Sequence, residues 1–195
     1  MIKLPDTAAA SAALGVAETY LSDAMLRHSM RVHVWGATYG AQRGLDYDAE
    51  LLFVAAMFHD LSLVPVFDSH TVAFEEASGQ VARVFAAGAG WSRERGERLA
   101  EVIVRHMWPD VDPADDVEGH LLSRAAAVDI VGRNVDDFTP AFRAEVLGAY
   151  PRTDLADEFL ACFQAQAARK PTSSAARAVQ SGLATRMAAN PLDVA

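Results

Sequence analysis

Apolar residues recur along most of the chain at the three- and four-residue spacing of amphipathic helices. No segment shows the alternation of apolar and polar residues that is typical of a half-buried strand. Residues that commonly cap helices stand where these periodic segments would begin, namely Ser22, Asp48, Ser92 and Thr139. The pattern therefore predicts an all-α fold, a single bundle of about eight helices.

The expected helices span residues 8–20, 23–43, 49–59, 71–87, 92–107, 121–134, 140–149, 154–169 and 174–189. The helix over 49–59 is apolar nearly all round, so we expect it to be central and buried. The acidic stretch 109–118 is expected to be a solvated loop. We expect one domain over 1–195, with a core over about 22–135 and the C-terminal helices over 140–189 packed on it.

Composition narrows the class of protein. The net charge of −9 disfavours a nucleic-acid or anionic-membrane partner, because phosphate groups bind basic surfaces. The single cysteine, Cys162, leaves no disulfide framework and no cysteine-rich zinc site. The sequence contains no run of 18 apolar residues, so it predicts no transmembrane helix. We therefore expect a cytoplasmic protein. The apolar C-terminal helices either cover the core or pair with a second subunit in a homo-oligomer.

An adjacent His59–Asp60 pair lies within the apolar stretch over residues 55–61. Burying an ionised carboxylate without a partner costs several kcal/mol or more. Imidazole and carboxylate groups both bind divalent cations well, so a metal ion is the simplest partner for this pair. The sequence therefore predicts a metal centre around which the other helices close.

Three further polar residues lie on apolar helix faces: His28, His106 and Asp129. Taken singly, each histidine is more typical of a hydrogen-bonded core residue, and the aspartate of a partner for an arginine. Together with the His59–Asp60 pair, their order along the chain favours a shared metal centre.

The run His28-Ser-Met-Arg-Val, the pair His59–Asp60 and the later Asp129 resemble the signature of the HD-domain superfamily of metal-dependent enzymes. That superfamily is all-α and holds one or two divalent metal ions. The resemblance implies that His28, His59, Asp60 and Asp129 are the metal ligands. It covers residues 28–132.

A narrower resemblance points to the cyanamide-hydratase-like branch. It rests on Tyr47-Asp48-Ala-Glu50-Leu-Leu-Phe-Val-Ala-Ala-Met-Phe-His59-Asp60-Leu61, Phe74-Glu75, Val128-Asp129-Ile-Val-Gly132 and Arg169-Lys170-Pro171. Those enzymes add water across a carbon–nitrogen triple bond at a zinc ion, which implies a hydro-lyase with a small-molecule substrate. This chain has Ser62 where the branch usually has glycine. This departure bears on the identity of the substrate more than on the identity of the metal.

Two imidazoles and two carboxylates suit zinc, iron(II) or manganese. Such an ion lowers the pKa of water toward about 7. His106 and Asp60 are the candidate catalytic residues, with His106 as the proton donor, since imidazole titrates near neutral pH. In a two-metal site, His106 would instead bind the second ion, with Asp60 bridging.

The alternative activity is an HD-family phosphohydrolase acting on a nucleotide or phosphomonoester. Many such enzymes place a lysine shortly after the His–Asp pair, but residues 61–67 carry no cation here. The apolar loop favours a small, weakly charged substrate. Arg27, Arg31 and Arg105 flank the histidines and keep the phosphate alternative open. A di-iron oxygenase and a non-catalytic binding module are weaker alternatives.

The remaining polar candidates are expected to be structural. His33 should face away from His28, and His120 should begin a helix at the surface. Glu75 and Glu76 are expected to be solvated, although the resemblance draws attention to Glu75. Whether His70 reaches the site as a second-metal ligand or lid residue stays open.

Overall fold

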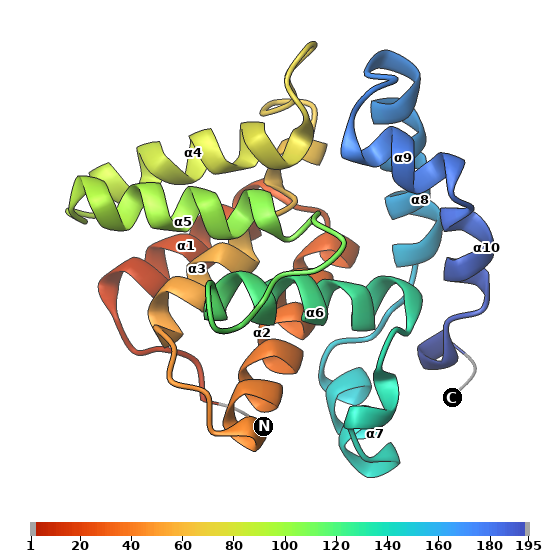
Figure 1. Ribbon diagram of the computed structural model, residues 1–195, viewed down its shortest axis with the longest axis horizontal. Helices are drawn as coiled ribbons and strands as arrows, with labels where there is room; N and C mark the ends of the chain where they lie inside the picture. Colours follow the sequence, from red (N-terminus) through yellow and green to blue (C-terminus); the bar gives the residue numbers. More distant parts are fainter. Residues whose placement is uncertain (1–2, 194–195) are drawn as a thin grey trace.

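The computed structural model describes residues 3–193 and is all-α, with no strand in that range, as the sequence predicted (Figure 1). The α-helices are α1 (Ala8–Tyr20), α2 (Asp23–Arg43), α3 (Ala49–Phe58), α4 (Phe74–Gly88), α5 (Arg93–Arg105), α6 (Val117–Val131), α7 (Pro140–Ala149), α8 (Leu155–Arg169), α9 (Ser174–Gln180) and α10 (Leu183–Ala188). Short 3₁₀ turns are η1 (Leu61–Leu63), η2 (Val135–Asp137) and η3 (Pro191–Asp193). The expectation of about eight helices is therefore too low for the described residues.

Side-chain caps fix the starts of most helices. Ser22, Asp48, Ser92 and Thr139 each accept a hydrogen bond from the backbone N–H three residues later, which confirms the predicted caps. Asp116 does the same for Gly119, so α6 begins four residues before the predicted start. The prediction that residues 109–118 are entirely a solvated loop is wrong at this end, because Asp116 and Glu118 are buried.

Three other predicted boundaries are wrong. Helix α6 ends at Val131, three residues before the predicted end. Helix α4 begins at Phe74, three residues later than expected. The predicted helix over 174–189 is two helices, because Gly182 adopts a left-handed backbone conformation with φ of 83° between α9 and α10.

The helices form a layered arrangement in which α3 lies at the centre (Figure 1). Helices α1, α2, α5, α6 and α4 all contact α3, and its apolar residues are buried as predicted. Helices α4 and α5 pair with each other, and α8, α9 and α10 pack together on the other side of α2 and α6. One apolar cluster surrounds α3, and a second joins α8–α10 to Met25, Phe74 and Ile130. The division of the chain into a core and a C-terminal layer stays a prediction.

The end of α6 is joined tightly to the last turn of the described chain. Gly132 has φ of 68°, and a Cβ atom there would lie 2.4 Å from Pro191 Cδ and 2.9 Å from Asn190 Oδ1. Asn190 Nδ2 donates to the backbone carbonyl of Asp129 at 2.9 Å. Turn η3 is thereby held against the helix that carries Asp129.

Replacing Gly132 with alanine is expected to lower the free energy of unfolding by roughly 2–4 kcal/mol, because it combines a left-handed backbone strain with a steric overlap. Urea unfolding followed by circular dichroism measures this loss. Gly15, in the interior of α1 with nothing near its added Cβ, is the matched control. Gly15→Ala should leave stability unchanged or raise it by up to about 1 kcal/mol. Equal effects of the two substitutions would contradict the packing described for Gly132.

Within residues 3–193, none of the helices is both long enough and apolar enough to cross a membrane.

Candidate metal centre

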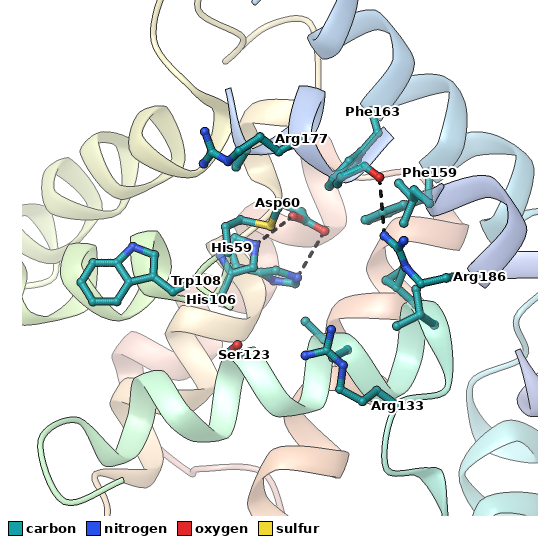
Figure 2. Close-up of a pocket in the computed structure, with 18 of the residues that line it drawn as sticks. His59, Asp60, His106, Trp108, Ser123, Arg133, Phe159, Phe163, Arg177 and Arg186 are labelled. Atoms are coloured by element: carbon teal, nitrogen blue, oxygen red, sulfur yellow. Dashed lines mark hydrogen bonds and ion pairs between the residues drawn. The ribbon is translucent and has the colours of Figure 1, made fainter. Parts of the chain in front are cut away.

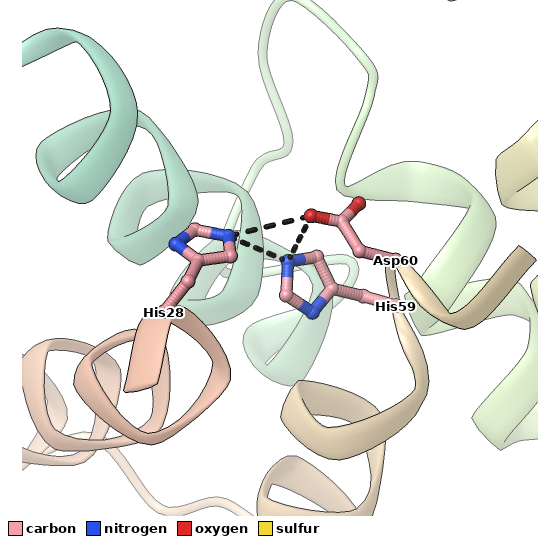
Figure 3. Close-up of side chains that lie close together, drawn as sticks. All are labelled: His28, His59 and Asp60. Atoms are coloured by element: carbon pink, nitrogen blue, oxygen red, sulfur yellow. Dashed lines mark hydrogen bonds and ion pairs between the residues drawn. The ribbon is translucent and has the colours of Figure 1, made fainter. Parts of the chain in front are cut away.

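Three nitrogen and oxygen atoms converge where the two apolar clusters meet (Figure 3). His28 Nε2 lies 3.2 Å from His59 Nε2 and 3.3 Å from Asp60 Oδ2, and His59 Nε2 lies 3.2 Å from that same oxygen. All three side chains are buried. Atoms that each lie about 2.0–2.1 Å from a tetrahedral zinc ion are about 3.3 Å apart. The spacing therefore fits three ligands of one metal ion.

The hydrogen bonds behind the two imidazoles explain why a cation fits between them. His28 Nδ1 lies 2.7 Å from Asp129 Oδ2, and His59 Nδ1 lies 2.8 Å from the Ala56 carbonyl oxygen. Both partners only accept hydrogen bonds, so each Nδ1 carries the proton and donates it. In the neutral rings the Nε2 atoms are then bare, and they face each other and the Asp60 carboxylate, whose Oδ2 lies 3.3 Å from His28 Nε2 and 3.2 Å from His59 Nε2. Three electron-rich atoms need a positive charge between them, and the group could bind a metal ion.

The local chain positions these side chains. His59 is the C-cap of α3, and Asp60 opens turn η1, so the pair leaves the central helix together. Burial alone would raise the pKa of Asp60, but the neighbouring His59 and His28 hold that pKa well below its usual range. Burial lowers the pKa of His28, and the hydrogen bonds and charges of Asp129 and Asp60 outweigh burial and raise it. Asp60 is therefore ionised in the folded protein.

Asp129 lies behind His28 and outside the converging group. Its carboxylate accepts hydrogen bonds from His28 Nδ1, from Arg31 Nε at 2.8 Å and Nη2 at 2.9 Å, and from Trp35 Nε1 at 3.1 Å. His28, Arg31 and Trp35 share one face of α2, three and four residues apart. In the structure Asp129 orients the His28 ring, and its own role as a fourth metal ligand stays a prediction.

His106 lies on the opposite side of Asp60. Its Nε2 atom is 3.7 Å from Asp60 Oδ1, and its ring stands at 88° to that of His59, with centroids 5.0 Å apart. His106 Nδ1 makes a short hydrogen bond to the Ile103 carbonyl. Burial, followed by the charge of His59, lowers the pKa of His106 to about 4. The structure thus brings four of the five predicted residues together, with Asp129 directly behind them.

The other polar candidates differ in how exposed their side chains are. His70 is exposed and lies outside the group. His120 is half-buried and bonds to the Val111 carbonyl oxygen at 2.7 Å. The expectation that Glu75 is solvated is wrong: it is buried at the start of α4, and burial raises its pKa. Ser62, the departure from the family pattern, is fully buried in η1, where its backbone N–H donates to Ser78 Oγ at 2.9 Å.

His33 is a buried structural histidine on α2. Its ring packs edge-on against Phe53, with centroids 4.9 Å apart and the planes at 88°. Neither ring nitrogen has a hydrogen-bond partner among the described residues. Burial lowers its pKa from 6.5 to about 4, so the ring stays neutral in the folded protein at neutral pH.

This low pKa predicts acid sensitivity. The unfolded chain binds a proton at His33 once the pH falls below about 6.5, whereas the folded chain does so only near pH 4. The contribution of His33 to the free energy of unfolding is therefore complete above pH 6.5 and is lost as the pH falls toward 4. The expected loss at pH 5 is about 2 kcal/mol. Urea unfolding at pH 7.5 and pH 5 should show a smaller pH-dependent loss for His33→Leu than for the wild type. An unchanged pH dependence would contradict this assignment.

A pocket of about 380 Å³ opens over the centre (Figure 2). His28, His59, Asp60 and His106 form part of its lining. Aromatic side chains of α8 line it as well, with the rings of Phe159 and Phe163 stacked 4.4 Å apart.

The loop that follows turn η1 is fastened to α8. Asp68, in the segment after the His59–Asp60 pair, accepts hydrogen bonds from Gln166 Nε2 at 2.9 Å and Lys170 Nζ at 3.0 Å, and from Arg169. The Arg169–Lys170 motif found in the sequence therefore holds this loop.

Sequence reasoning did not single out the pocket's cations. Arg31 is fully buried against Asp129, and Arg105 pairs with Asp116, so neither is a free cation for a substrate. Instead Arg133, Arg177 and Arg186 line the pocket. They lie more than 70 residues after His59 in chain order, and only the packing of α9 and α10 reveals their proximity.

Comparison with known proteins gives no match: no protein-family model matches the chain, and no curated protein is significantly similar to it. Membership of the HD-domain superfamily thus stays a prediction.

Proposed function

We propose that this chain is a metal-dependent enzyme of the HD-domain type that uses a metal-activated water on a small substrate. The proposed reaction is hydration of a nitrile-like carbon–nitrogen bond, as in cyanamide-hydratase-like hydro-lyases. The observation that supports it is the buried convergence of His28 Nε2, His59 Nε2 and Asp60 Oδ2 beside a pocket. A divalent ion there, zinc by preference and iron or manganese otherwise, would supply hydroxide at neutral pH by lowering the pKa of water.

The protein's own groups would hold and move the protons. Asp129 and the Ala56 carbonyl orient the ligand imidazoles through their Nδ1 atoms. His106 donates its Nδ1 proton to the Ile103 carbonyl, so its Nε2 presents a lone pair beside Asp60. We infer that His106 first accepts a proton from the attacking water and then returns it to the developing nitrogen anion. This order refines the donor role expected from the sequence.

The second candidate is phosphoester hydrolysis. It is favoured by one observation, the three arginines that line the pocket, because guanidinium groups pair well with oxyanions. Their presence weakens the expectation of a weakly charged substrate, which rested on the apolar loop after Asp60.

The metal content per chain of the purified protein, measured by elemental mass spectrometry, is the first test. We expect about one zinc ion per chain. We also expect conversion of cyanamide to urea, with no ammonia released. Release of phosphate from a phosphomonoester with manganese would select the second candidate. Failure to take up zinc, iron or manganese would overturn the proposal.

A further inference from the structure

Three arginines approach the pocket from different elements, and we call them the arginine rim: Arg133, Arg177 and Arg186. Arg133 follows the C-cap of α6, Arg177 lies on α9 and Arg186 on α10. Figure 2 shows their guanidinium groups on different sides of the His59–Asp60 centre.

Within the described residues no rim arginine has a carboxylate at ion-pair distance, although the charge of Arg177 acts on the buried Glu75. Among the described residues, every arginine outside the rim except Arg83 has a carboxylate partner, and no rim arginine has one. Arg177 donates to the Thr172 carbonyl, and Arg186 donates to the Ala178 and Ser181 carbonyls at the end of α9, so the acceptors of both are uncharged. No hydrogen bond from the Arg133 side chain is present in the described residues. In a chain with 26 acidic and 17 basic residues, this local excess of cations indicates a site for an anion.

Asp60 is the only carboxylate in the described lining, and it belongs to the metal centre. An anion at the rim therefore faces three positive groups. The rim and the metal centre share one pocket, so a single ligand can contact both.

The pocket also has room for more than a nitrile. Water occupies about 30 Å³ per molecule in the liquid, so a 380 Å³ pocket holds roughly a dozen water-sized groups. A substrate with three non-hydrogen atoms would fill about a quarter of it. The stacked Phe159 and Phe163 rings and the half-exposed Trp108 offer flat apolar surfaces between the centre and the solvent.

We propose that the pocket binds a small organic anion, with an apolar, ring-sized body against the aromatic side chains and a carboxylate or phosphate group held by the arginine rim. The proposal rests on the proposed function only in assigning the opposite end of the ligand to the metal centre. It names a substrate class larger than cyanamide: an anion of about ten non-hydrogen atoms whose opposite end reaches the metal centre.

The test is isothermal titration of the wild-type protein with benzoate, phenylphosphonate, inorganic phosphate and the neutral benzamide. We expect benzoate or phenylphosphonate to bind at least tenfold more tightly than benzamide and inorganic phosphate, and the tighter of the two identifies the anionic group. The double variant Arg133→Gln/Arg177→Gln should weaken that binding about tenfold or more, as expected for loss of charge-assisted hydrogen bonds. Arg93→Gln, which removes an exposed charge at the start of α5, is the matched control and should bind as the wild type does.

Repeating the titrations on chelator-treated wild-type protein separates this proposal from the proposed function. Binding that persists without metal and depends on the rim supports the anion site even if no metal is ever taken up. Binding that requires the metal and is unchanged in the double variant places the anion at the metal centre. That result overturns the proposal, while the proposed function stands. Affinities for benzoate and phenylphosphonate that both equal the affinity for benzamide would also overturn it.

Discussion

Replacing His59 with alanine is expected to remove the bound metal and to lower the proposed activity at least about a thousandfold, since metal-ion catalysis contributes several kcal/mol to the barrier. Within residues 3–193, His59 supplies one of the three atoms that converge at the centre. The helical far-ultraviolet circular dichroism should be retained, because the variant removes no buried ion pair with an arginine. Elemental analysis and a urea-release assay measure the two effects. His28→Gln should behave in the same way.

His70→Ala is the matched control, because His70 is exposed and outside the converging group. It should keep both metal and activity. His106→Ala is informative in a different way: with one metal ion it keeps the metal and loses about 10²–10⁴ in rate, as for the loss of a general acid–base group. A drop in metal content would instead identify His106 as a ligand of a second ion. A His59→Ala protein with full metal content would disprove the assigned centre.

The second large effect is expected at Arg31 and Asp129. Both side chains are fully buried, and two hydrogen bonds join them. Burial favours a neutral carboxyl, but Arg31 and then His28 hold the pKa of Asp129 well below its usual range. Arg31→Met leaves Asp129, and Asp129→Asn leaves Arg31, as a buried charge without its main partner. Either substitution is expected to lower the free energy of unfolding by about 3–5 kcal/mol. Urea unfolding of the metal-free proteins measures this loss.

A double variant sharpens that prediction. Arg31→Met combined with Asp129→Asn removes both charges, so it should cost less than the sum of the two single losses. Arg143→Met, which breaks an ion pair with the exposed Asp136, should cost under about 1 kcal/mol. Asp129→Asn should also weaken metal binding about 10–100-fold, because His28 loses the carboxylate that orients it. Single losses as small as that of Arg143→Met would contradict the buried ion pair.

Local signals in the sequence were enough to predict the helices. Caps such as Ser22 and Thr139, and the glycine stop at Gly44 with φ of 64°, act within one turn of their own helix. The split at Gly182 was missed because an isolated glycine is compatible with a continuous helix and only its left-handed conformation breaks it. The same local logic found the His59–Asp60 pair, since ionised groups in an apolar run need a partner.

Contacts between distant segments were beyond such reasoning. Whether Asp129 faces a metal ion or an arginine depends on how α6 packs against α2, a contact between residues about 100 positions apart. Glu75 is buried because the second apolar cluster surrounds the start of α4, although two adjacent glutamates suggest solvent. The arginine rim depends on the same packing of the last helices.

The candidate metal centre and the arginine rim of its pocket come from different stretches of the chain. The three converging atoms belong to residues 28–60, whereas the arginine rim belongs to residues 133–186. Substitutions in α9 and α10 can therefore alter which molecule enters without disturbing the group that would activate water. A protein built in this way can acquire new substrates by changing its last helices while its chemistry is inherited intact.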